Sequence, residues 1–173
     1  MPFTKLRREI EPRWVAEYCL THYAGFPVSY RVPVGPIPAD MVTEMGMDKA
    51  IRAYRPWRPE VDAIVYLPNY LVLIEAKVFK YMDGLAKLPM YKSQIPLTPQ
   101  LKEHKDKEVL MELLLPVEIP WVTSMALNSG VKVVVWAPDW VLKIWEERNK
   151  YWEPEQRLLR EQRKEVLRKL GYE

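Results

Sequence analysis

Two carboxylates and one ammonium group interrupt the most apolar stretch of this 173-residue chain. Asp62 stands in the run 61–67, and Glu75 and Lys77 stand in the run 70–78. Carboxylates held close together on an apolar sheet need a cation, a shared proton or open water. Oxygen ligands without a nearby Cys or His favour Mg²⁺ or Mn²⁺ over zinc. An ammonium beside them can orient a water molecule or stabilise charge on a phosphate, so the set indicates metal-assisted hydrolysis.

The two runs predict a β-hairpin that turns at Pro68–Asn69. With the turn centred there, residues pair when their numbers sum to 137, so Asp62 lies opposite Glu75 and Glu60 opposite Lys77. Side chains alternate with a period of two, which places these four on one face and leaves the other face wholly apolar. Directly opposed Cβ atoms lie roughly 4.5 to 5.5 Å apart. The pattern predicts a charge cluster at the open end of the hairpin; a hairpin end with solvated ion pairs is the alternative.

The spacing of Asp62, twelve further residues and then Glu75-Ala76-Lys77 resembles the PD-(D/E)xK nuclease superfamily. That superfamily includes many restriction endonucleases and the archaeal Holliday-junction resolvases. The resemblance implies that the aspartate and glutamate bind metal and that the lysine assists hydrolysis of a phosphodiester. One departure is that Pro59 is separated from Asp62 by two residues. An acidic residue of the first helix often completes the metal site in that family, which makes Glu17 the candidate here.

The function implied by the resemblance is a metal-dependent DNA endonuclease, structure-specific in the manner of a resolvase, with Mg²⁺ or Mn²⁺ as cofactor. A phosphodiester substrate requires positive charge around the site. The expected nucleic-acid contacts are Arg58, Lys80, Lys87 and Lys92, and an ordinary solvated surface is the alternative. Two other functions stay open: a non-catalytic assembly or DNA-binding protein of a phage or mobile element that keeps the nuclease fold, and a hydrolase of another phosphoester.

The elements around the hairpin predict an α/β fold with a mixed sheet of about five strands, as in the restriction-endonuclease-like core. A strand, helix, strand order near the end of this core predicts a parallel crossover. Pro89 is expected to bend or split the helix that follows the hairpin. Besides the hairpin, the expected elements are helices at 9–23, 39–45, 82–94 and 121–128, strands at 26–34, 108–115 and 131–137, and a polar linker at 96–107.

The predicted domains are a nuclease-like core over residues 1–138 and a C-terminal helical extension over 139–173. Residues 143–169 hold nine Lys or Arg against six Glu, which accounts for the net charge of +3. The last helix, expected from 154 to 170, carries a partial apolar stripe among these charges. We expect it to dock on the core or to form a homodimer; lying along DNA is the remaining alternative.

The composition indicates a folded protein of a reducing compartment. Apolar residues make up 49% of the chain, and a single cysteine, Cys19, excludes a disulfide within it. The first residues, MPFTKLRREIEPRW, contain no apolar signal-peptide core, and no run is long enough to span a membrane. We therefore expect no membrane partner and a cytoplasmic location, in the host cytoplasm or the virion if the protein is phage-encoded.

Overall fold

The computed structural model describes residues 10–150 and 153–171. The chain divides into two compact units, Met1–Ala137 and Pro138–Glu173. The first unit contains a five-stranded sheet in the order β1-β2-β3-β4-β5. Strand β2 pairs antiparallel with β1 and with β3, and β4 pairs parallel with β3 and with β5. The predicted mixed α/β architecture is therefore confirmed. The strands are β1 (Val28–Pro33), β2 (Glu60–Tyr66), β3 (Tyr70–Ala76), β4 (Glu108–Leu115) and β5 (Lys132–Val135).

The hairpin of β2 and β3 has the register that the sequence predicts. The paired residues run from Tyr66 with Leu71 to Ala63 with Ile74, and each pair sums to 137. At the turn, the Leu67 N–H donates to the Tyr70 carbonyl over 3.0 Å. No bulge shifts the strands along these pairs, so Asp62 and Glu75 stay on the same face.

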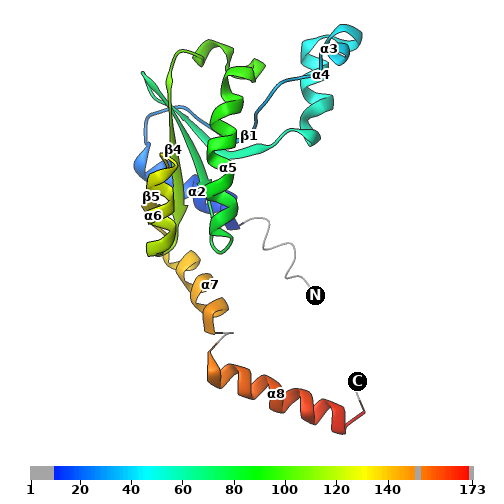
Figure 1. The fold of residues 1–173 in the computed structure, drawn as a ribbon, viewed down its shortest axis with the longest axis vertical. Coiled ribbons are helices and arrows are strands. Elements are labelled where there is room, and N and C mark those ends of the chain that lie inside the picture. Colours follow the sequence, from blue (N-terminus) through cyan, green and yellow to red (C-terminus); the bar gives the residue numbers. More distant parts are fainter. Residues whose placement is uncertain (1–9, 151–152, 172–173) are drawn as a thin grey trace. The chain divides into compact units, whose positions relative to one another are not determined.

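Helices cover both faces of the sheet (Figure 1). Helix α2 (Ile10–His22) lies against the face of Ile74 and Glu112, because the Tyr18 hydroxyl donates to the Glu112 carboxylate. Helix α5 (Tyr81–Gln94) lies on the opposite face, where Gly84 touches the side chains of Glu75 and Leu113. Helix α6 (Pro120–Asn128) packs beside α5 and forms the crossover from β4 to β5.

The larger part of the core lies between the sheet and the helices α5 and α6. It is built from alternate residues of the central strands, because side chains of a strand alternate between faces. Its fully or almost fully buried members include Ile64, Leu71, Leu73, Leu113 and Leu115 from the sheet and Leu85, Leu88, Tyr91, Val122 and Ala126 from the helices.

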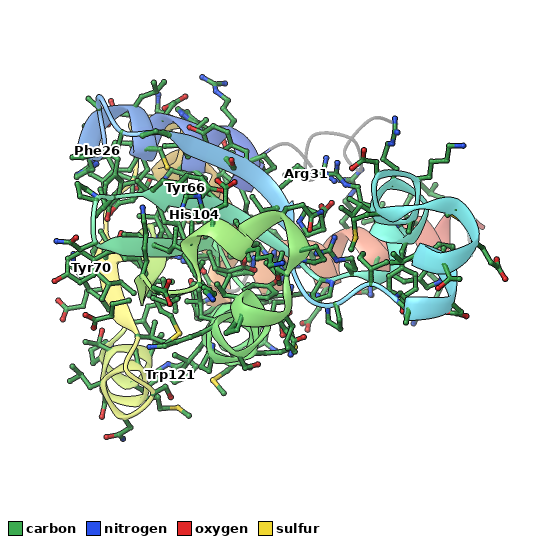
Figure 2. The ribbon with its side chains drawn as sticks, turned by 90° about the horizontal axis from the view of Figure 1, so that it is seen from above. Phe26, Arg31, Tyr66, Tyr70, His104 and Trp121 are labelled. Atoms are coloured by element: carbon green, nitrogen blue, oxygen red, sulfur yellow. The ribbon has the colours of Figure 1, made fainter. Side chains whose placement is uncertain are left out.

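Three local details add to or correct the predictions. Helix α5 continues through Pro89 as one element, so of the predicted bend or split the split is excluded. The predicted helix at 39–45 is confirmed, and a second helix follows it. The connection after β1 holds two helices, α3 (Ala39–Met45) and α4 (Met47–Tyr54), followed by the 3₁₀ turn η1 (Arg55–Trp57). They are separated by Gly46, whose φ of 79° ends the first helix and lets the second begin. The segment predicted as a polar linker forms the 3₁₀ turns η2 (Ile95–Leu97) and η3 (Pro99–His104). There the His104 ring lies against Tyr66, with ring centroids 4.9 Å apart (Figure 2).

The described residues of the second unit form the helices α7 (Asp139–Lys150) and α8 (Pro154–Lys169). Over the part of the chain that the structure describes, no helix has the length and apolar character needed to cross a membrane.

Candidate active site

Four oxygen atoms surround the Lys77 ammonium group at the end of the hairpin. Its Nζ lies 2.9 Å from Glu75 Oε1, 3.3 Å from Glu11 Oε2 and 3.9 Å from Asp62 Oδ2. It also donates to the Ala76 carbonyl over 2.9 Å. The structure thus brings Asp62, Glu75 and Lys77 together, as the hairpin register requires, and adds Glu11 from α2.

Asp62 ends the hydrogen-bonded ladder between β2 and β3. The last pair is Ala63 with Ile74. One step further, the N–H of Ala76 donates to Asp62 Oδ2 over 2.9 Å. Because a carboxylate replaces a backbone carbonyl as the acceptor, the strands part here and the Asp62 side chain lies beside Glu75 and Lys77.

Glu75 is a buried carboxylate that has hydrogen-bond partners for only one of its two oxygens among the described residues. The residue is 1% exposed, and its Oε2 has no hydrogen-bond partner among the described residues. Burial and, to a smaller extent, the charge of Asp62 raise the pKa of Glu75 to about 7, although the Lys77 ammonium acts in the opposite direction. Glu75 therefore exchanges a proton near neutral pH, and a second cation at this position would favour its ionised form.

Lys77 stays an ammonium in this environment. Burial alone would lower its pKa, but the carboxylates of Glu75, Asp62 and Glu11 outweigh burial and raise the pKa above the ordinary range of lysine. A group with this pKa does not act as a general base at neutral pH. It can donate hydrogen bonds to water or to phosphate oxygens and neutralise negative charge.

The acidic residue that α2 places against Lys77 is Glu11, whereas Glu17 was expected. Glu17 forms an ion pair with Arg13, with 3.0 Å between Oε1 and Nε. The two glutamates are six residues apart, so they lie about 120° from each other around the helix. Glu11 begins the buried stripe of α2, which continues through Trp14, Val15 and Tyr18 at helical spacing. The spacing of this stripe is the feature of the sequence that indicates Glu11. The Oε1 atom of Glu11 also accepts a hydrogen bond from the Val78 N–H over 3.3 Å.

Glu60 does not lie against Lys77 as predicted. Because the ladder ends at Ala63, the strand before it turns away from β3 and follows β1, where Glu60 pairs with Pro33. Its carboxylate forms ion pairs with Arg31 over 3.3 Å and with Arg55 over 3.0 Å. Arg31, labelled in Figure 2, marks this separate cluster at the end of β1.

The four basic residues expected to contact nucleic acid differ in exposure. Lys87 lies at the rim of the site, with its Nζ 3.7 Å from Glu75 Oε1 and 46% of its side chain exposed. Lys80 and Lys92 are exposed at the two ends of α5. Arg58 is 5% exposed and donates to the Gly35 carbonyl and to Gln100, so it is a buried structural residue in this conformation.

Gly84 allows α5 to pass directly over the site. A Cβ atom at this position would lie 2.8 Å from Lys77 Cγ and 2.6 Å from Leu113 Cδ1. Tyr91, two turns further along α5, is buried, and burial together with Glu75 and Asp62 raises the pKa of its hydroxyl. The helix thus covers the site with a glycine and a neutral phenol.

Within residues 10–150 and 153–171, no group of three or more His, Cys, Asp or Glu side chains has the arrangement of a metal site. The Lys77 ammonium lies among the carboxylates instead. The residues nevertheless suit a hard divalent cation, because all the donors at this point are oxygens and one of them, Glu75 Oε2, is buried with no partner in the described part of the chain. Asp62, Glu75, Glu11 and the Ala76 carbonyl could hold such an ion if the Lys77 side chain turned away.

Comparison with known proteins gives two distant structural likenesses. No protein-family model and no curated protein sequence matches the chain. The crystal structure of a repair endonuclease from Pyrococcus abyssi aligns at 17% identity and a TM-score of 0.45, over 73% of this chain and 46% of that one. The crystal structure of a protein of unknown function aligns at 14% identity and a TM-score of 0.40, over 72% and 56%. The chain therefore spans about half the length of each, and these scores are too low to define a shared fold.

Proposed function

We propose that this protein is a metal-dependent endonuclease that hydrolyses phosphodiester bonds in DNA, with the core of a restriction-endonuclease-like enzyme. The supporting observation is the convergence of Asp62, Glu75 and Lys77 at the point where the hairpin ladder ends. Burying two carboxylates and an ammonium group on a sheet face costs folding free energy, which favours a functional role for these side chains.

In this proposal Asp62, Glu75 and Glu11 hold Mg²⁺ or Mn²⁺ together with the Ala76 carbonyl. The bound ion would polarise the phosphate and lower the pKa of a water molecule. Glu75 contributes its unpartnered Oε2, and Asp62 is held in position by the Ala76 N–H.

Lys77 has the role of a hydrogen-bond donor. In this structure the Lys77 ammonium neutralises the carboxylates of Asp62 and Glu75. A bound divalent ion would neutralise them instead. Once released from them, it would donate to the attacking water or to a phosphate oxygen. Lys87 lies on the exposed side of Glu75 and is suited to contact the substrate backbone, with Lys80 and Lys92 further out on α5.

Cleavage assays with matched variants test the proposal. Supercoiled plasmid, linear duplex and a four-way junction are incubated with the purified protein and Mg²⁺ or Mn²⁺. Asp62→Asn and Lys77→Ala should each lower the cleavage rate by at least about 100-fold. Glu11→Gln should lower it as well, whereas Glu17→Gln, the same change on the same helix, should leave it close to that of wild type. Unchanged cleavage in both Asp62→Asn and Lys77→Ala would exclude this site.

The alternative is a non-catalytic protein, such as an assembly or DNA-binding subunit of a phage or mobile element. It is favoured by the ion pairs of Lys77, which neutralise the carboxylates without a metal. Calorimetry with Mn²⁺ separates the two functions, because a protein that binds no metal at millimolar concentration cannot use the proposed site. Activity on a small phosphodiester but not on DNA would instead favour a hydrolase of another phosphoester.

A homodimer formed through residues 139–173 is part of the same proposal. The exposed leucines of α8 provide the apolar surface for it. Light scattering of the full-length protein at several concentrations would show whether the mass is that of one chain or two.

A further inference from the structure

Helix α8 carries a charge surplus on one side only. Arg157, Arg160, Lys164 and Arg168 follow one another at spacings of three or four residues, so at about 100° per residue they lie within roughly 80° of the helix circumference. We call these four residues the basic face. One carboxylate, Glu161, lies among them, and the face carries a net charge of +3.

The rest of α8 is electrically balanced. Its remaining charged residues are two cations, Arg163 and Lys169, and two carboxylates, Glu155 and Glu165. Lys169 and Glu165 form an ion pair at 2.9 Å. The whole surplus of the helix, which equals the net charge of the chain, therefore lies on the basic face.

Most of the exposed apolar residues of α8 lie away from the basic face. Leu159, Val166 and Leu170 are roughly 125° to 165° from its middle around the helix, and each is more than half exposed. Leu158 lies about 115° from the middle on one flank, and Leu167 lies beside Arg160 on the other. A shallow hollow lined by Arg157, Arg160, Glu161 and Lys164 marks the basic face itself. Apolar surface thus borders the basic face at Leu167 but lies mainly on the far side, so a polyanion can contact the basic face while the far side packs on protein.

Charge complementarity to the proposed DNA substrate favours nucleic acid as the partner. A duplex presents a dense row of phosphate charges that several cations on one helix side can neutralise together. Basic and apolar residues also occur together on helices that lie in a membrane interface, so binding to anionic vesicles is the competing outcome of the test.

We propose that the basic face of α8 is a nucleic-acid binding surface that contacts the phosphate backbone without reading sequence. This inference deepens the proposed function, since it names a surface outside the candidate active site that would hold the same substrate. Successive cations on the face are about one helical turn apart, so several phosphates could be contacted at once.

The test compares two double variants of the full-length protein that remove the same charges from the same helix. Arg157→Gln with Lys164→Gln lowers the charge of the basic face from +3 to +1, and Arg163→Gln with Lys169→Gln removes the two cations of the flanks. Each is combined with Asp62→Asn so that binding is measured without cleavage. Binding of a fluorescent 30-bp duplex is followed by anisotropy between 50 and 300 mM salt, and helix content is checked by circular dichroism.

Loss of two phosphate contacts should make the slope of log K against log salt less steep by about 1.8 and raise the Kd roughly tenfold or more at 0.1 M salt. The flank variant should bind as the parent does. Equal effects of the two variants, or none from either, would overturn the inference, as would loss of binding to phosphatidylserine vesicles with duplex binding unchanged. The proposed function is tested separately, by measuring DNA cleavage with protein that retains Asp62.

Discussion

The buried carboxylate of Glu75 should make the stability of this protein depend on pH between about 4.5 and 7. Burial and the neighbouring Asp62 raise its pKa from the ordinary 4.5 to about 7 in the folded chain. The folded state therefore holds a proton that the unfolded state has lost in this range. The stability that this group contributes is fully present below about pH 4.5 and is lost as the pH rises through about 7.

The magnitude follows from the difference between the two pKa values. At about 1.4 kcal/mol per pH unit, the change from 4.5 to about 7 corresponds to roughly 3 kcal/mol. Glu75→Gln removes this titration but keeps an oxygen that accepts from Lys77. Lys77 itself stays charged throughout the range because its pKa is raised, so it does not add to the difference.

The assay is urea unfolding of wild type and Glu75→Gln at several pH values between 4.5 and 8.5, with EDTA present. Relative to wild type, the variant should gain about 3 kcal/mol in the free energy of unfolding from the lowest to the highest pH. Glu103→Gln, the same change at an exposed position, is the control and should follow wild type. Parallel curves for wild type and Glu75→Gln would refute the assignment of a raised pKa to this buried carboxylate.

Two further substitutions test the packing around the site. Gly84→Ala should destabilise the protein by about 1 to 3 kcal/mol in urea unfolding, because the new Cβ would overlap Lys77 Cγ at 2.8 Å. A stability gain of about 1 kcal/mol, the usual effect of replacing glycine in a helix, would show that α5 is not pressed against the site. Tyr18→Phe should cost about 1.5 to 3 kcal/mol, because its hydroxyl donates to the buried Glu112 carboxylate over 2.9 Å. Leu20→Ala, at a largely exposed position of the same helix, should change the stability by less than about 0.5 kcal/mol, and equal losses from both would contradict the anchoring role of Tyr18.

The hairpin and its register could be predicted from the amino-acid sequence alone. The alternation of apolar residues and the Pro68–Asn69 turn are local features, and a two-residue period allows only one face for Asp62 once Glu75 is placed. The same reasoning predicted the parallel crossover from β4 to β5 through α6. These features depend on residues that are close along the chain, so a single sequence contains them.

Which other side chains join the cluster depends on how the helices and strands pack together. Glu11 meets Lys77 because the buried stripe of α2 packs on the sheet and extends back to Glu11, while Glu17 lies about 120° away around the helix. Glu60 was misplaced because β2 leaves β3 at Asp62 and follows β1 toward Arg31. These outcomes depend on contacts between elements that are far apart along the chain, where a spacing rule no longer applies.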